Sequence, residues 1–297
     1  MYNAHFGLRE LPFGITPDTS FFFAAPSPQE ALNTLLVAVK NGEGFMKITG
    51  EVGTGKTLLC RKFMASLDDS FVTAYIPNPF LEPRTLMMAL AEELEITLEQ
   101  NIDQYHLLKA INHRLLVLAR AGKRVVLCID EAQAMPLETL ETLRLLTNLE
   151  TGKRKLLQIV LFGQPELNRK LQLESIRQLT QRIIFHYHLG PLSRDDLDFY
   201  VSHRLSVAGY AGARLFARDA IKVLHRASRG VPRLVNVLAH KSLMLTYGQG
   251  RQQVAAVQVR AAARDTIAAR NYSPLLWLGA TLALLAAGAA LSWMVFQ

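Results

Sequence analysis

Short apolar runs alternate with amphipathic segments along the first 190 residues of this 297-residue chain. Four runs have the length and apolar content of buried strands, and they occupy residues 44–50, 70–76, 123–130 and 156–163. Between and after them, apolar positions recur at a helical spacing, which predicts helices over residues 83–95, 103–121, 136–149 and 165–172. Strands separated by helices form a parallel sheet with helices on both faces. The pattern therefore predicts an α/β domain over residues 1–190.

The pattern changes after residue 193, where we find only helical periodicity. The predicted helices cover residues 194–208, 216–228, 231–248 and 254–270. Ser193 and Asp196 have the spacing of a capping box at the start of the first of these helices, with Asp in place of Glu. We therefore expect an all-helical domain over residues 191–272, with the boundary near Gly190 and Pro191.

The last predicted element is an apolar run over residues 275–296, which contains no charged residue. Its 22 residues are long enough to cross a hydrocarbon core of about 30 Å as a helix. Trp277 and Trp293 lie near its two ends, and basic residues precede it. Because basic flanks stay in the cytoplasm, the run predicts a single-pass transmembrane helix that anchors cytoplasmic domains to the inner membrane of a bacterium.

The composition narrows the class of ligand or partner without naming it. Half of the residues are hydrophobic and a fifth are charged, so the chain can bury a substantial core. The formal net charge of +8 suits an acidic partner: a nucleic acid, an anionic lipid or a nucleotide. Cys60 and Cys128 lie far apart, in a predicted helix and a predicted strand. We interpret both as reduced structural thiols.

The segment GEVGTGKT at residues 50–57 matches the pattern G-x-x-x-x-G-K-[ST] between a predicted strand and a predicted helix. Its glycines permit a backbone path in which several N–H groups converge on phosphate oxygens. In this pattern Lys56 reaches the β and γ phosphates, and the Thr57 hydroxyl binds Mg²⁺. The predicted nucleotide-binding residues of the loop are Gly50, Glu51, Val52, Gly53, Thr54, Gly55, Lys56, Thr57 and Leu58.

A pair of acidic residues ends the third apolar run, RVVLCIDE, further along the chain. In P-loop enzymes a carboxylate at the end of such a strand holds Mg²⁺, which assigns Asp130 to the metal. The neighbouring Glu131 is placed to polarise an attacking water. We therefore predict phosphoryl hydrolysis, with Glu131 and Lys56 as catalytic residues.

These motifs and the helical domain behind them resemble the AAA+ ATPases. Longer stretches resemble the ExeA/GspA group of secretion ATPases, and within it the MshM-type ATPases of MSHA type IV pilus biogenesis. The stretches are FGLRELPFGITPDTSFFF, GEGFMKITGEVGTGKTLLCRK, VVLCIDEAQAMPLETLETLRLLTNLET, LLQIVLFGQPEL, IRQLTQRI and SRGVPRLVNVLAHKSLMLTYG. The resemblance implies ATP as substrate with Mg²⁺, a lid formed by the helical domain, and a homo-oligomer as the active form.

The resemblance also implies roles for residues outside the two motifs. Gln164 lies where a sensor 1 residue would report on the γ-phosphate, and Arg233 matches the sensor 2 arginine of the lid. Arg182 lies at the usual place of an arginine finger, which reaches the nucleotide of a neighbouring subunit, and Arg177 is its competitor. The aromatic residues 21–23 either border the adenine or pack in the core.

Two functions follow from these observations. The first is a membrane-anchored ATPase that supports assembly or operation of a type IV pilus or a general secretion apparatus, with inner-membrane components of that apparatus as partners. The alternative is a nucleic-acid-directed ATPase of the transposition or helicase-loader type, in which basic residues of the helical domain would meet phosphate. The predicted membrane helix favours the first function, so we do not expect nucleic acid as a partner.

Overall fold

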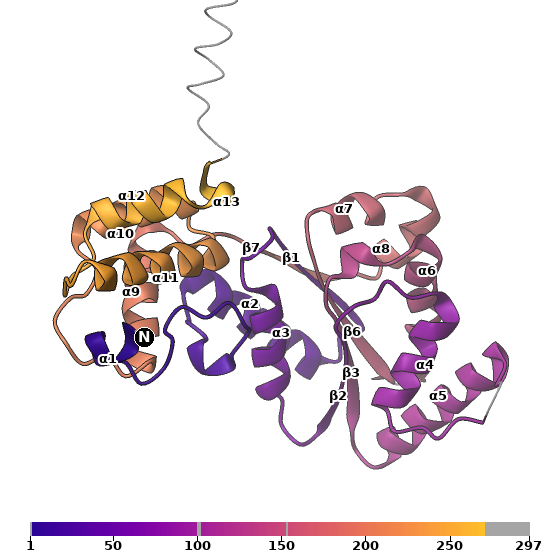
Figure 1. Cartoon of the computed structure of the whole chain (residues 1–297). Coiled ribbons are helices and arrows are strands. Elements are labelled where there is room, and N and C mark those ends of the chain that lie inside the picture. The colour runs from indigo at the N-terminus through magenta and orange to yellow at the C-terminus, as the bar shows by residue number, and fades with distance from the viewer. Residues whose placement is uncertain (1, 100–101, 153, 271–297) are drawn as a thin grey trace, which may run out of the picture. The chain divides into compact units, whose positions relative to one another are not determined.

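The computed structural model describes residues 2–99, 102–152 and 154–270. The α/β part is built on a five-stranded sheet of β1 (Phe45–Gly50), β2 (Phe71–Ile76), β3 (Arg124–Ile129), β6 (Leu157–Gly163) and β7 (Phe185–Leu189). All strand pairs are parallel, and the order across the sheet is β2-β3-β6-β1-β7. The predicted α/β fold with a parallel sheet is therefore confirmed (Figure 1).

The central strands β3 and β6 are buried on both faces, which explains why they are almost continuously apolar. On β3, Val125, Leu127 and Ile129 belong to one hydrophobic core, whereas the alternate residues Val126 and Cys128 belong to a second. The two cores lie on opposite faces, because successive strand residues point in opposite directions. Figure 1 shows the helices of the two layers on the two sides of the sheet: α4 (Pro83–Glu93), α5 (Gln104–Arg120) and α6 (Leu137–Leu146) on one, α2 (Pro26–Asn41) and α3 (Lys56–Ala65) on the other.

Local chemistry sets where these helices begin and end. Pro26 and Pro83 occupy the first turns of α2 and α4, where a missing N–H breaks no helical hydrogen bond. Asp103 begins α5, since its carboxylate accepts the N–H of His106 at 2.8 Å. Gly42 ends α2 with a left-handed φ of 85°. The ends of the predicted helices agree with the observed ones to within about one turn.

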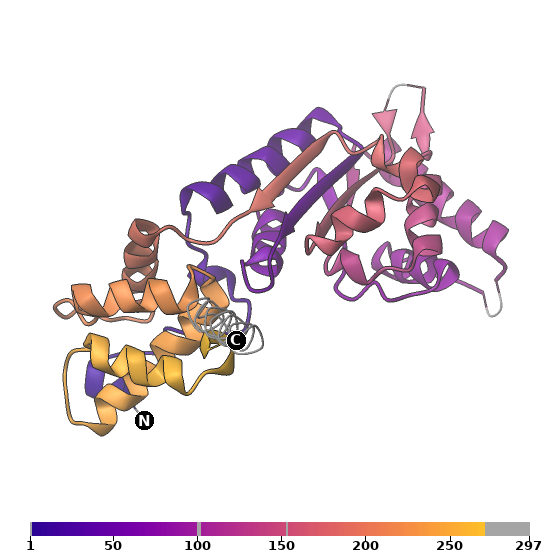
Figure 2. The same ribbon diagram turned by 90° about the horizontal axis from the view of Figure 1, so that it is seen from above.

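A short hairpin in this unit is absent from the predicted elements. It consists of β4 (Glu150–Thr151) and β5 (Arg154–Lys155), the two short arrows at the upper edge of Figure 2. An ion pair between Lys155 and Glu150 joins its two strands. Two residues per strand are too few to produce a periodic pattern. Two short helices follow β6: α7 (Glu166–Leu171) was predicted, and α8 (Arg177–Thr180) was not.

Packing divides the chain into two compact units. Residues 15–207 with 231–233 form the α/β unit, which includes α9 (Arg194–Val207). The Ser193 hydroxyl begins α9 by accepting the N–H of Asp196 at 3.1 Å and donating to its carboxylate at 2.6 Å, as its spacing predicts. The domain ranges 1–190 and 191–272 stay a prediction.

The second unit is helical and combines the N-terminal segment with the last part of the described chain. Its helices are α1 (Tyr2–Phe6), α10 (Arg218–Ser228), most of α11 (Pro232–Gly248), α12 (Ala256–Arg264) and α13 (Ile267–Arg270). Aromatic contacts hold the N-terminal segment in place: the rings of Phe13 and Phe216 lie 5.8 Å apart, and a 2.8 Å hydrogen bond joins the Tyr2 hydroxyl to Nδ1 of His240. The first residues of the chain therefore complete a core built mainly from its end.

The predicted helix over residues 254–270 is two helices. It is interrupted at Asp265 and Thr266, between α12 and α13. The Lys241 ammonium of α11 donates to the Asp265 carboxylate at 2.7 Å and to the Thr266 hydroxyl at 3.1 Å. These bonds come from a residue distant in sequence, so the helical periodicity of the segment could not reveal the break.

The helices of the described residues contradict the predicted localisation, a single-pass anchor in the bacterial inner membrane. Among residues 2–99, 102–152 and 154–270, no helix has both the length and the apolar character needed to cross a membrane. The longest helices there, α5 and α11, have 17 residues each and carry charged side chains. The segment 275–296, to which the span was assigned, lies outside the described residues.

Candidate functional site

The loop between β1 and α3 supplies the geometry that the glycine-rich motif predicts. Gly53 and Gly55 have φ angles of 84° and 99°, in the left-handed region that glycine enters without steric cost. The Thr54 hydroxyl donates to the Glu51 carbonyl at 2.9 Å and closes the turn. Gly55 then caps α3, whose first residue is Lys56. The loop therefore opens onto the N-terminus of a helix, where backbone N–H groups favour an anion.

The Lys56 ammonium lies within this loop. It donates to the carbonyls of Gly50 at 2.7 Å and Glu51 at 2.9 Å. Burial lowers the pKa of Lys56, while the nearby carboxylates of Glu131 and Asp130 act in the opposite direction. A phosphate group at the loop would offer this cation stronger acceptors than the two carbonyls, because charge-assisted hydrogen bonds are stronger than those to neutral groups.

The Thr57 hydroxyl and the Asp130 carboxylate meet directly. Thr57 Oγ1 donates to Asp130 Oδ2 at 2.6 Å, although 73 positions separate the two residues. Asp130 is buried at the end of β3, and this burial raises its pKa against the effect of the hydrogen bonds from Thr57 and from the Glu131 N–H. Oxygen donors of these two kinds are what Mg²⁺ prefers, and Mg²⁺ keeps several waters and phosphate oxygens as further ligands. The pair therefore fits the predicted ion.

Glu131 follows with a left-handed backbone, at φ 49° and ψ 36°. Its Oε2 accepts two side-chain amides, from Gln133 Nε2 at 2.5 Å and from Gln164 Nε2 at 3.1 Å. The structure thus brings together two predicted residues, Glu131 and Gln164. It adds Gln133, which the sequence reasoning missed although it stands two positions after Glu131 in DEAQ.

An apolar pocket borders the phosphate loop within the α/β unit. Its lining residues are Phe22, Phe23, Pro28, Thr54, Gly55, Leu58, Leu59, Leu189, Leu192, Tyr200 and Pro232. Thr54, Gly55 and Leu58 were predicted to bind the nucleotide, and bordering the adenine was one of two alternatives for Phe22 and Phe23. Pro28, Leu189, Leu192, Tyr200 and Pro232 come from other parts of the chain, and neither their type nor their spacing marks them.

A buried arginine positions the aromatic segment of this pocket. The Arg204 guanidinium of α9 lies 4.5 Å from the ring centroid of Phe21, and it donates to the Tyr200 hydroxyl at 3.0 Å. The Tyr200 ring in turn lies 5.8 Å from that of Phe23, edge to face. Phe21 is therefore a core residue, and Phe22 and Phe23 line the pocket.

Arg233, the predicted sensor 2 residue, lies against the phosphate loop. Its backbone N–H donates to the Gly53 carbonyl at 3.1 Å, and a Cβ atom placed on Gly53 would come within 2.7 Å of the Cβ of Arg233. The Arg233 side chain is exposed. The structure therefore brings the predicted sensor 2 segment into contact with the phosphate loop. The Arg233 side chain is not buried in the core.

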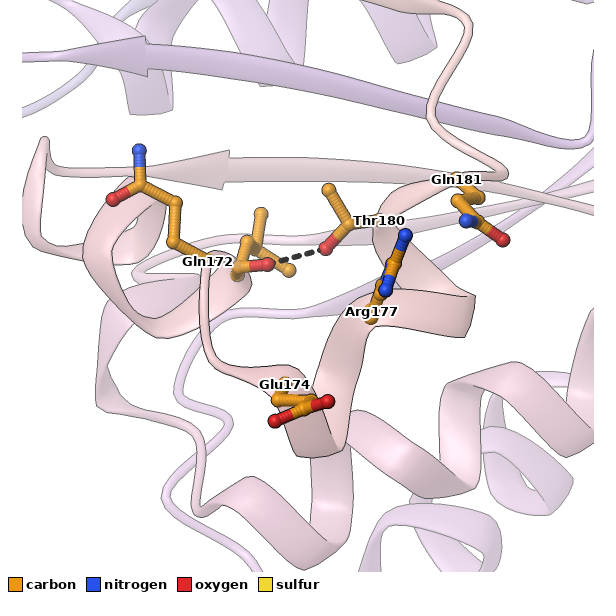
Figure 3. A pocket seen from close by; sticks show the side chains of 6 residues that line it. Gln172, Glu174, Arg177, Thr180 and Gln181 are labelled. Carbon is orange, nitrogen blue, oxygen red and sulfur yellow. Dashed lines mark hydrogen bonds between the residues drawn. The ribbon is translucent and has the colours of Figure 1, made fainter.

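The two arginine-finger candidates differ in their surroundings. The Arg182 guanidinium donates to the Thr147 hydroxyl at 2.5 Å and to the Arg144 carbonyl at 3.3 Å, at the C-terminal end of α6. The exposed side chain of Arg177, on α8, makes none of the side-chain hydrogen bonds or ion pairs found among the described residues. Arg177, Thr180 and Gln181 line a pocket of about 450 Å³. Figure 3 shows these three side chains close together. Contact with another subunit would require Arg182, but not Arg177, to leave its partners.

Comparison with known proteins finds a domain family and a relative that this chain resembles. The AAA domain family matches residues 39–171, which include both motifs, Gln133 and Gln164. General secretion pathway protein A of Aeromonas hydrophila is 41% identical over 271 residues, or 91% of this chain and 49% of that protein. The chain thus spans about half the length of this relative.

Solved structures share the fold at low sequence identity. Cdc6p of Pyrobaculum aerophilum is 19% identical, with a TM-score of 0.69 over 88% of this chain and 74% of that one. The ORC2 protein of Aeropyrum pernix is 17% identical, with a TM-score of 0.61 over 87% of this chain and 73% of that one. Likeness at this level shows the fold alone. The AAA domain match and the 41% identity make this chain similar to the AAA-domain proteins of the general secretion pathway protein A type.

Proposed function

We propose that the chain binds and hydrolyses ATP, and that the energy serves a general secretion or type IV pilus apparatus. The observation that carries the enzymatic part is the 2.6 Å hydrogen bond between Thr57 and Asp130. It joins the phosphate loop to the strand end that carries Glu131, so one site contains the phosphate-binding, metal-binding and water-activating groups.

In the proposed reaction, the loop N–H groups and Lys56 bind the phosphates, and the apolar pocket beside Leu58 receives the base. Thr57 and Asp130 would hold Mg²⁺, which would supply positive charge to neutralise the phosphates. The Glu131 carboxylate orients the attacking water and receives its proton. Arg233 approaches the same loop and adds positive charge near the phosphates.

Glu131→Gln tests the enzymatic part of the proposal. The substitution keeps the shape of the side chain but removes its basicity, so we expect ATP hydrolysis to fall by about 10²-fold or more, with ATP affinity unchanged within about twofold. Glu138→Gln is the matched control, because Glu138 is exposed on α6 and makes no contact with the site. Hydrolysis by Glu131→Gln at the rate of the unaltered protein would refute the proposed role.

We also propose that the active form is a homo-oligomer in which an arginine of one copy reaches the nucleotide of the next. Arg177→Ala and Arg182→Ala separate the two candidates. Loss of hydrolysis with nucleotide binding nearly intact identifies the arginine that acts between subunits. Because Arg182 also bonds the end of α6, Arg182→Ala should lower the melting temperature whether or not it is catalytic. Specific activity that does not depend on protein concentration would contradict an arginine supplied by a neighbour.

The partner is proposed from the relative and from the motif resemblance. General secretion pathway protein A is named for secretion, and the quoted stretches resemble the MSHA pilus ATPases, so we propose components of such an apparatus as the partner. Glu131→Gln with ATP should hold the partner long enough for crosslinking and mass spectrometry in the native cell. Recovery of pilus or secretion components supports the proposal. Salt-sensitive binding of duplex DNA, with no such components recovered, would favour the nucleic-acid alternative.

A further inference from the structure

We propose that Gln133 is a positioning residue that fixes the Glu131 carboxylate, so that one oxygen is held by the protein and the other faces the attacking water. The inference rests on the proposed ATP hydrolysis. Its basis is the Glu131 network, which we define as Glu131, Gln133 and Gln164.

The orientation of the Gln133 amide follows from its second partner. Gln133 Oε1 accepts the backbone N–H of Gln164 at 2.9 Å. A backbone N–H can only donate, so the atom that faces it must be the amide oxygen. The amide nitrogen of Gln133 therefore faces Glu131, where it donates to Oε2 at 2.5 Å.

Both amides of the network donate to the same carboxylate oxygen. Gln133 Nε2 and Gln164 Nε2 lie 2.5 Å and 3.1 Å from Oε2 of Glu131. Among the described residues, no hydrogen bond to Oε1 of Glu131 is found. Two donors on one oxygen set the plane of the carboxylate and leave the lone pairs of the other oxygen available to a water molecule. This is the arrangement that a base needs when it must hold a nucleophile in a defined direction.

The backbone around the network is shaped for this contact. Glu131 has a left-handed φ of 49°, which is rare for a residue with a side chain and clusters at functional sites. The Ala134 N–H donates to the Glu131 carbonyl at 2.8 Å, and the resulting turn, η2 (Ala132–Ala134), brings Gln133 back over the carboxylate. Gly163 lies beside this turn: a Cβ there would come within 2.7 Å of a methyl group of Leu167 and into ordinary contact, at 3.4 Å, with Gln133 Oε1.

Gln133 also connects two strand ends. It stands after β3, and its oxygen is bound to the backbone of the residue that follows β6. Displacement of Gln164 would therefore move the amide that holds Glu131. Gln164 acts on the carboxylate twice, once through its own side chain and once through Gln133.

Gln133→Met tests the proposal, because methionine keeps the length of the side chain but has no strong hydrogen-bonding group. We expect kcat for ATP to fall by about tenfold to a hundredfold, as when a catalytic group loses its orientation, with KM and nucleotide affinity unchanged within about twofold. Gln104→Met is the control, since Gln104 is exposed at the start of α5. In a Glu131→Gln background, Gln133→Met should cause no further loss, because the two residues act as a unit.

A measurement on the nucleotide-free protein gives an independent result. In a side-chain amide NMR spectrum, Glu131→Ala should shift the Gln133 and Gln164 amide protons toward the positions of exposed glutamines and leave the Gln104 signals in place. A Gln133→Met protein with unchanged kcat, or Gln133 signals that ignore Glu131→Ala, would overturn the inference. If the unaltered protein hydrolyses no ATP but the NMR shifts occur, the proposed function fails and the positioning contact stands.

Discussion

Replacing Gly53 with alanine should destabilise the protein more than replacing Gly55, although both residues have a left-handed backbone. Their φ angles are 84° and 99°, so each alanine pays a similar conformational penalty of about 1–2 kcal/mol. The surroundings differ. No atom of the described residues lies within 4 Å of a Cβ on Gly55, whereas a Cβ on Gly53 would come within 2.7 Å of Arg233 Cβ and 3.2 Å of Val231 Cγ1.

The contact at Gly53 is hard to relieve. Arg233 Cβ is attached directly to the backbone and cannot rotate away, and the Arg233 N–H is bonded to the Gly53 carbonyl at 3.1 Å. Overpacking of this kind costs about 1–3 kcal/mol. We therefore expect the free energy of unfolding to fall by about 2–5 kcal/mol in Gly53→Ala and by about 1–2 kcal/mol in Gly55→Ala.

Urea unfolding of the nucleotide-free proteins, followed by circular dichroism, measures both free energies of unfolding. Without nucleotide, the assay measures folding alone and is independent of phosphate binding, in which we propose that both glycines take part. Hydrogen exchange at the Val231 and Arg233 amides should also rise in Gly53→Ala and stay unchanged in Gly55→Ala. Equal destabilisation by the two substitutions, within about 0.5 kcal/mol, would refute the argument that residues 231–233 press on the phosphate loop.

Three further predictions concern the core, a helix cap and pH. Phe63→Ala, at a fully buried position of α3, should lower the free energy of unfolding by about 3–5 kcal/mol, which urea unfolding will show. Ser193→Ala should cost about 1 kcal/mol through loss of the α9 cap, whereas Ser202→Ala on the exposed side of α9 should change stability little by the same assay. Burial lowers the pKa of His240 below its usual 6.5, so the unfolded chain binds more protons in the window just below 6.5. Stability should therefore fall as pH is lowered through 6.5, and thermal melts of His240→Gln should show a weaker fall, while an unchanged slope would contradict this assignment.

The sequence predicts most of the elements of the α/β unit because their signals are local. The apolar runs of β1, β2, β3 and β6 match the observed strands closely, since a strand buried on both faces needs nearly every residue to be apolar. Capping at Ser193 is equally local. The strand order β2-β3-β6-β1-β7 has no local signal in the sequence, because it depends on how each helix crosses the sheet.

The candidate site likewise contains residues that the sequence predicts and residues that it does not. Lys56, Thr57, Asp130 and Glu131 lie in two short motifs whose chemistry can be read from residue type and spacing. The sequence could not predict that Tyr200 lines the pocket, because no pattern in its own segment indicates that it lies near the phosphate loop. Local sequence patterns therefore indicate the reacting groups, whereas tertiary packing brings together the residues that line the pocket.

The sequence by itself determined the two motifs, the parallel α/β architecture and the family resemblance, because each depends on neighbours along the chain. Tertiary structure alone decided that Thr57 donates to Asp130, that Gln133 joins Glu131 to Gln164, and that Arg182 is bonded at the end of α6. It also decided that the N-terminal segment packs with the last described helices. The physical reason is that hydrogen bonds and contacts between distant residues depend on distances in space, which leave no period in the order of residues.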